Sequence, residues 1–120
     1  MLLKELSLAR GVSGDEGAVR ELLRLAVQEH VDECRVDALG NLICLKRARG
    51  GAADGVGAAD GVWPRTVMVA AHMDEVGFII TGHNGDGTLR FGAVGGYDDR
   101  LLLSKQVLVG PNAVPGVIGY

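Results

Sequence analysis

The stretch TVMVAAHMDEVGFII, Thr66 to Ile80, decides the fold because an apolar run leads directly into His72, Asp74 and Glu75. Residues 67–71 lack the polar alternation of a half-exposed strand, so they predict a central strand covered on both faces, as in an α/β sheet. Side chains at positions i and i+2 of a strand share a face, so His72 and Asp74 should converge where this strand ends. Open α/β sheets bind ligands at the carboxyl ends of their strands, and the sequence therefore places a candidate site here.

The residues alone leave several interpretations of this pair open. A neutral imidazole at His72 can ligate a metal ion while Asp74 shares the ion or accepts the other ring N–H. Alternatively, His72 is an ordinary hydrogen-bonded histidine at a strand end and Asp74 caps a turn, which a short and common H-x-D triplet favours by itself. A mononuclear metal site of His72, Asp74 and His83 is a further alternative, whereas Glu75 should point away from its neighbours.

The segment before this stretch predicts two helices. Apolar residues at helical spacing over residues 2–9 indicate a short amphipathic helix that ends by Gly11. Ser13 and Glu16 have capping-box spacing, which predicts a second helix with Ser13 as its N-cap and His30 near its end.

Residues 33–47, ECRVDALGNLICLKR, predict a β-hairpin that turns at residues 37–41, with Gly40 at positive φ. Cys34 and Cys44 are symmetric about Leu39 and could face each other across it. A cytosolic environment would keep both thiols reduced. There is no C-x-x-C pair, so neither a zinc ribbon nor a thioredoxin-like site is encoded.

The sequence pattern of the chain changes after the hairpin. The sequence GAADGV at residues 51–56 is repeated at 57–62, which we interpret as an enlarged, flexible loop without a packed face. Beyond Gly77, short β-prone runs alternate with turn residues, and NGDG at residues 84–87 is a strong hairpin signal. We therefore expect an α/β portion over residues 1–75 and a small β-barrel or sandwich over residues 76–120.

The composition excludes several classes of partner. The net charge is -3, from 12 basic and 15 acidic residues, which gives no electrostatic footprint for nucleic acid or an anionic membrane. No apolar run reaches the roughly 20 residues that a membrane span needs, and the N-terminus carries charges that a signal peptide would avoid. The sequence therefore predicts a cytoplasmic protein.

Five blocks of sequence resemble the dinuclear metallo-aminopeptidases, a family that includes glutamyl and deblocking aminopeptidases and the tetrahedral (TET) aminopeptidases, with some members labelled endoglucanases. The blocks occur in the order and approximate spacing of that family and cover nearly the whole chain apart from the duplicated loop. They are ARGVSGDEGAVREL (9–22), VDALGNLICLKR (36–47), VMVAAHMDEVGFII (67–80), LRFGAVGGYDDRLLL (89–103) and VPGVIGY (114–120).

The resemblance implies that residues 1–75 are the N-terminal part of an α/β aminopeptidase catalytic domain and residues 76–120 the first part of an inserted small β-barrel-like domain. It also implies that His72 binds one of two divalent metal ions, zinc or cobalt, and that Asp74 supports this site as a catalytic residue. The implied activity is metal-dependent removal of N-terminal residues from peptides, by a protein that forms homo-oligomers at full length.

In this family, the bridging aspartate, the remaining ligands and the general-base glutamate lie in the later part of the catalytic domain. We therefore expect this chain to be an N-terminal fragment that lacks most of the metal ligands and is inactive alone. The alternative is a non-catalytic interaction or oligomerisation module derived from the same fold, in which unpaired strand edges recruit partners.

Overall fold

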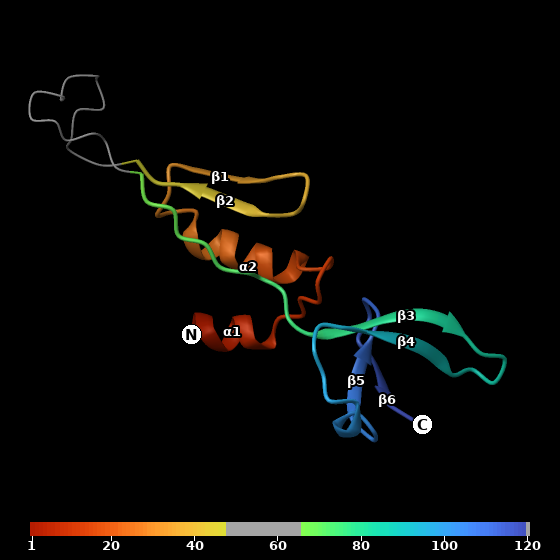
Figure 1. The fold of residues 1–120 in the computed structure, drawn as a ribbon. Helices are drawn as coiled ribbons and strands as arrows, with labels where there is room; N and C mark the ends of the chain where they lie inside the picture. Colours follow the sequence, from red (N-terminus) through yellow and green to blue (C-terminus); the bar gives the residue numbers. More distant parts are fainter. Residues whose placement is uncertain (48–65, 120) are drawn as a thin grey trace, which may run out of the picture. The chain divides into compact units, whose positions relative to one another are not determined.

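The computed structural model describes residues 1–47 and 66–119 (Figure 1). Contacts divide the chain into two compact units, Met1–Glu75 and Val76–Tyr120, and each is described by itself. The duplicated loop predicted at residues 51–62 lies outside the described residues. Across the part of the chain that is described, no helix is both long enough and apolar enough to span a membrane. The identity of the two units as catalytic and inserted domains stays a prediction.

Two helices begin the first unit. Helix α1 (Leu2–Leu8) follows the predicted range and ends at Ala9, whose backbone is extended. Helix α2 (Gly17–Val27) starts later and ends earlier than the sequence predicts. Its N-cap is Glu16 rather than Ser13, and the predicted capping box is wrong.

The capping prediction fails because both of its side chains have other partners. The Ser13 hydroxyl donates to Asp74, and the Glu16 carboxylate accepts from the backbone N–H of Gly14 at 2.6 Å. A capping box needs the serine to accept from the helix and the glutamate to reach back to the serine N–H. Ser13 therefore donates to a long-range acceptor, Asp74, in place of accepting from a local backbone N–H.

The predicted hairpin is confirmed. Strands β1 (Glu33–Val36) and β2 (Leu42–Leu45) pair antiparallel, and Gly40 has a φ of +87°. The Asp37 carboxylate fixes the turn by accepting from the backbone N–H groups of Leu39 and Asn41, both at 2.9 Å. These contacts are the Asx-type turn bonds that a short polar side chain makes.

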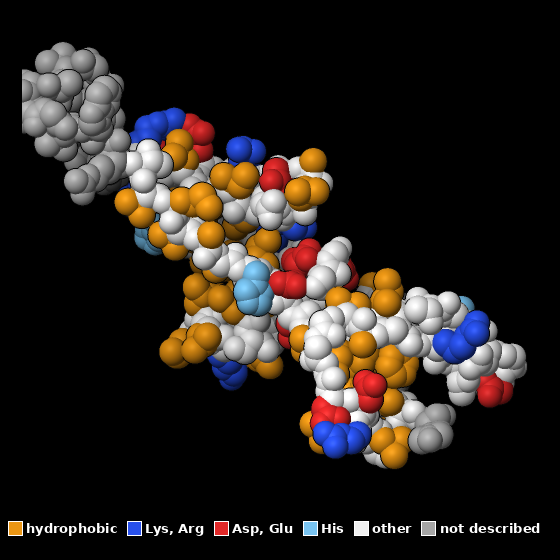
Figure 2. Space-filling model, in the orientation of Figure 1, with side chains coloured by type: hydrophobic (Ala, Val, Ile, Leu, Met, Phe, Trp, Pro, Cys, Tyr) orange, Lys and Arg blue, Asp and Glu red, His pale blue; other side chains and the backbone are white. Residues whose placement is uncertain are grey.

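The central strand predicted at residues 67–71 is wrong. Residues 66–74 are extended but carry no strand ladder, and the side chains of Val67, Met68 and Val69 are 81%, 86% and 92% exposed. A covered strand needs hydrogen-bonded neighbours, and within the described ranges this segment has only one parallel bridge, between Val12 and Glu75 at its end. Hydrophobic side chains are correspondingly widespread on the surface shown in Figure 2.

The backbone at Gly11 lies close to the backbone at Glu75, although the two residues are far apart in the sequence. The Glu75 N–H donates to the Gly11 carbonyl at 2.7 Å, and the Glu75 carboxylate accepts from the Gly11 N–H at 3.3 Å. A β-carbon on Gly11 would lie 2.7 Å from Cγ2 of the buried Val19 and 3.3 Å from the Met73 carbonyl oxygen. A side chain at this position would force Val19 to shift, so glycine favours the close approach of residues 11–13 to residues 73–75.

The described residues of the second unit form two antiparallel hairpins, and each hairpin is a separate two-stranded sheet. One 3-10 turn lies between the two hairpins. The NGDG hairpin is confirmed, because its residues connect the first two strands. The elements are β3 (Gly77–His83), β4 (Leu89–Val94), η1 (Asp99–Leu101), β5 (Gln106–Val109) and β6 (Val114–Val117).

Three aromatic rings pack against one another at the β3–β4 hairpin. Phe78 meets Phe91 edge-on at 4.8 Å and stacks on Tyr97 at 5.0 Å, between ring centroids. The Tyr97 hydroxyl donates to the Gly77 carbonyl at 2.9 Å. The mixture of helices and strands in the chain agrees with the predicted α/β class, while the barrel-like closure of residues 76–120 stays a prediction.

Candidate functional site

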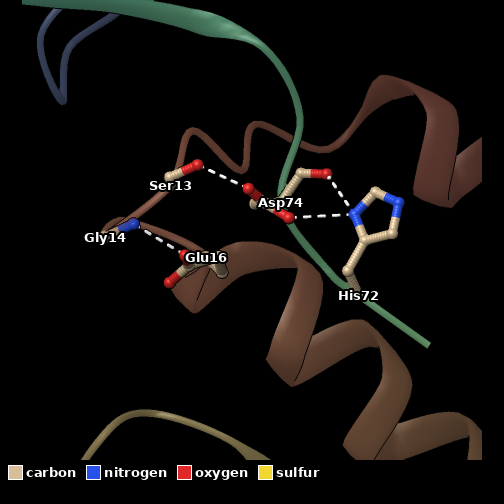
Figure 3. A network of polar contacts seen from close by, with 5 residues as sticks. All are labelled: Ser13, Gly14, Glu16, His72 and Asp74. Atoms are coloured by element: carbon tan, nitrogen blue, oxygen red, sulfur yellow. Dashed lines mark hydrogen bonds and ion pairs between the residues drawn. The ribbon is translucent and has the colours of Figure 1, made fainter. Parts of the chain in front are cut away.

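His72 and Asp74 converge, as their spacing predicts (Figure 3). The Nδ1 atom of His72 lies 2.9 Å from Oδ1 of Asp74 and 3.0 Å from the backbone carbonyl oxygen of the same residue. The other carboxylate oxygen, Oδ2, accepts a hydrogen bond from the Ser13 hydroxyl at 2.5 Å. A chain of three polar side chains thus runs from Ser13 through Asp74 to His72.

This network assigns the tautomer of His72. Both neighbours of Nδ1 are oxygen acceptors, so Nδ1 carries the proton of the neutral ring. The lone pair is then on Nε2, which points away from Asp74 in Figure 3. Since the His72 side chain is 85% exposed, this nitrogen is accessible to a ligand.

Asp74 is held as a carboxylate. The hydrogen bond from Ser13 lowers the pKa of Asp74 most, and the hydrogen bond with His72 lowers it further. A carboxylate that accepts such bonds is stabilised in its charged form. At neutral pH it therefore orients the imidazole without competing for its proton.

A hollow of about 160 Å³ lies beside this network. Its walls come from the start of α2, the turn between β1 and β2, and the extended segment before Glu75. Arg20 of α2 fixes the turn by donating from Nη1 to the Gly40 carbonyl at 2.6 Å. The lining residues are Glu16, Leu39, Gly40, Asn41, Ala71, His72, Met73 and Asp74. Ligand pockets for drug-sized molecules measure about 300–1,000 Å³, so this space suits an ion or a small group.

The other candidates lie elsewhere. Glu75 points away from the network, as expected, because its carboxylate contacts Gly11. His83 ends β3 in the second unit. Residues 1–47 and 66–119 contain no group of three or more His, Cys, Asp or Glu side chains that could hold a metal ion. The alternative of a mononuclear site made of His72, Asp74 and His83 therefore has no support in the described residues.

Sequence reasoning missed Ser13 and the hairpin turn as parts of this site. Ser13 lies between Gly11 and Gly14, and Gly14 has a φ of +90°. Glycines on either side of a serine indicate a tightly bent backbone, and this signal could have marked Ser13 as more than a cap. The wall formed by the β1–β2 turn has no comparable local signal, because it depends on how the hairpin packs against α2.

Comparisons with known proteins agree on one group of enzymes. The profile of a family described as M42 glutamyl aminopeptidase matches residues 57–120. The glutamyl aminopeptidase of Lactococcus lactis is 36% identical over 104 residues, which cover 87% of this chain and 26% of that protein.

Two solved structures have similar folds over 98% of this chain. An endoglucanase of Thermotoga maritima has a TM-score of 0.80 and 44% identity, and the match covers 33% of its chain. The TET1 peptidase of Pyrococcus horikoshii, which can assemble into a tetrahedron or a large octahedral shell, has a TM-score of 0.76 and 36% identity over 32% of its chain. The present chain thus spans about a third or less of each of these three proteins.

Proposed function

Because this chain belongs to the M42 glutamyl aminopeptidase family, we propose that it supplies His72 and Asp74 to the metal site of an aminopeptidase, a hydrolase that removes N-terminal residues from peptides. The resemblance seen in the sequence is confirmed by the family match. The observation that carries the proposal is the contact between Nδ1 of His72 and Oδ1 of Asp74, because it leaves Nε2 deprotonated and accessible.

The donor set fits one side of a divalent metal site. Ligating histidines almost always donate their other ring N–H to a carboxylate or a carbonyl oxygen, and Nδ1 of His72 has both. Zinc and cobalt accept imidazole nitrogen. When bound, such a cation supplies Lewis acidity for peptide hydrolysis. In this proposal His72 is the ligand, and Asp74, which the sequence led us to expect as a catalytic residue, acts by positioning it.

The same donor set is too small for a complete catalytic site. A catalytic zinc usually has three protein ligands. The described residues offer one imidazole with one carboxylate and no larger cluster. We therefore propose that the 120-residue chain alone has little or no peptidase activity, and that the two-metal site of the family needs ligands beyond those described here.

Calorimetric titration with zinc or cobalt tests the ligand assignment. The wild-type chain should bind weakly, and His72→Ala should reduce the affinity at least about tenfold, the loss expected for removal of a ligand or its close support. His83→Ala is the matched control, because His83 is also exposed but lies in the second unit. Equal losses in both variants would rule out His72 as the ligand.

An assay of amino-acid release from peptide amides tests the proposal that this chain alone does not form a complete metal site. The chain should release no more than a buffer control at any concentration of added metal. Activity that a chelator and His72→Ala both abolish would contradict the proposal that further ligands are needed.

A second candidate function, assembly with other copies, is favoured by the exposed run Val67–Val69. An apolar segment that has no strand partner among residues 1–47 and 66–119 can pair with another strand. The similar TET1 peptidase assembles into closed shells, which supports the proposal of a homo-oligomer. Light scattering across a concentration series tests it, because a chain that stays monomeric at every concentration would exclude this role. The cytoplasmic location and the peptide substrates stay predictions.

A further inference from the structure

The two cysteines of the chain lie directly opposite each other in the β1–β2 hairpin. Cys34 pairs with Cys44 in the antiparallel register, and their sulfur atoms are 3.2 Å apart. Both residues are exposed, and both are free thiols in this structure. A small molecule in solution can therefore reach either sulfur.

The register places the cysteines at a position that accepts a disulfide. Asp37 donates its N–H to the Asn41 carbonyl, so these residues form a hydrogen-bonded pair next to the turn. Pairs alternate along an antiparallel ladder, which makes Cys34 and Cys44 a non-hydrogen-bonded pair. The α-carbons of such pairs lie about 4.5 Å apart, inside the range of about 4.4–6.8 Å that disulfides span. A bridge therefore requires no change of register.

The same hairpin contributes a wall of the hollow beside His72. Its turn residues Leu39, Gly40 and Asn41 line that space. The turn depends on hydrogen bonds to Asp37 and on the contact between Arg20 and Gly40. Each of these bonds is noncovalent, and each is exposed or part-buried. A covalent link between the strands would restrain the turn in addition to these bonds.

We propose that Cys34 and Cys44 form a site of reversible modification, at which a small-molecule disulfide oxidises both thiols to one cross-strand disulfide that fixes the wall of the hollow. One cysteine thiolate attacks a sulfur of the small disulfide, forms a mixed disulfide and releases one small thiol. The second cysteine thiolate attacks the protein sulfur of the mixed disulfide, closes the bridge and releases the second small thiol. The two protons leave the cysteines and end on the released thiols.

The surroundings of the two thiols determine the rate of this thiol–disulfide exchange. Although the residue is exposed, partial desolvation of the Cys44 thiol raises its pKa, and the contact with Cys34 raises it further. Since the thiolate is the reactive form, exchange should be slow at neutral pH and faster in mildly alkaline buffer. Once a mixed disulfide forms, the second step is intramolecular and has a high effective concentration.

Oxidised glutathione is the probe. The chain is equilibrated with mixtures of oxidised and reduced glutathione, the remaining thiols are alkylated in acid-quenched samples, and the products are weighed by mass spectrometry. The wild-type chain should lose both thiols together, carry no glutathione and return to the dithiol form when a reductant is added. The matched variants Cys34→Ser and Cys44→Ser should each carry one glutathione under the same conditions.

Three results would overturn the proposal. They are two glutathiones on one wild-type chain, disulfide-linked dimers, or free thiols at ratios that modify the single-cysteine variants. Hydrogen exchange tests the second half of the inference: the amides of Gly40 and Asn41 should exchange at least severalfold more slowly in the bridged chain than in glutathionylated Cys44→Ser. Equal exchange would show that the bridge does not fix the turn.

Discussion

Ser13 and Asp74 are 61 residues apart in sequence, yet the Ser13 hydroxyl donates to Oδ2 of Asp74 at 2.5 Å. The contact exists because residues 11–13 lie beside the segment that ends at Glu75, through the pairing of Val12 with Glu75. Ser13, in the loop between α1 and α2, therefore holds the Asp74 carboxylate that orients His72.

Replacing Ser13 with Ala should raise the pKa of Asp74. The hydrogen bond from Ser13 is the largest cause of the lowered pKa, so its loss should move the value toward that of an ordinary aspartate. Carbon-13 NMR of the Asp74 carboxyl group over a pH series measures the change. Ser13→Thr keeps a hydroxyl and is the control. An unchanged pKa in Ser13→Ala would mean that the serine does not determine the state of Asp74.

Gly11→Ala should destabilise the first unit by about 1–3 kcal/mol, the usual cost of forcing extra atoms into a packed contact. The added β-carbon would lie 2.7 Å from Cγ2 of Val19, a buried branched side chain with little freedom to move. The free energy of unfolding in urea measures the effect.

Gly17→Ala is the matched control for this variant. Gly17 is the first residue of α2, and a β-carbon there would come no closer than 3.8 Å to the Arg20 guanidinium. Alanine should therefore be neutral or slightly stabilising at this position. A loss of stability in Gly17→Ala as large as in Gly11→Ala would mean that the close approach is not the cause.

Acid should loosen the β1–β2 turn. Hydrogen bonds from the Asn41 side chain and backbone lower the pKa of Asp37, and the Leu39 N–H contributes less. A carboxyl with a lowered folded-state pKa stabilises the fold fully above its unfolded pKa and loses that contribution as pH falls through the folded value. The amide signals of Leu39 and Asn41 in NMR spectra should therefore shift together in the acid range. Asp37→Asn removes the titrating group, so a persisting transition in this variant would assign the effect elsewhere.

Met68→Lys should reduce self-association if the exposed run mediates assembly. Met68 is 86% exposed in a segment that has no strand partner in the part of the chain that the structure describes, and a charge on such an edge disfavours pairing. Leu8→Lys is the control, because Leu8 is 73% exposed but lies on a helix whose backbone is already hydrogen-bonded. Light scattering should show a lower mass for Met68→Lys alone. The same change in both variants would indicate nonspecific hydrophobic association.

Features that depend on neighbouring residues were predictable from the sequence. The first helix, the turn at residues 37–41 and the NGDG hairpin each follow from periodicity or from turn residues that need no distant partner. The contact between His72 and Asp74 belongs to the same class, because an extended backbone brings i and i+2 together. The opposition of Cys34 and Cys44 follows from the symmetry of their hairpin.

Features that depend on distant residues were not predictable. The run 67–71 has the composition of a covered strand, but a strand forms only where another backbone supplies hydrogen bonds. Ser13 has the spacing of an N-cap, but Asp74 is the partner that it binds. In both cases the local sequence pattern indicated the structure that the residues favour by themselves. The structure that they adopt depends on contacts with residues far away in the sequence.

The pairing of Val12 with Glu75 also bears on how this gene can change. The site is joined by contacts among residues 11–13 and 72–75, and none of these contacts involves the duplicated GAADGV units. Each unit is a whole number of codons, so slippage that adds or deletes one copy keeps the reading frame. A change in the number of copies therefore leaves unchanged the residues that join Ser13 to the Asp74 carboxylate.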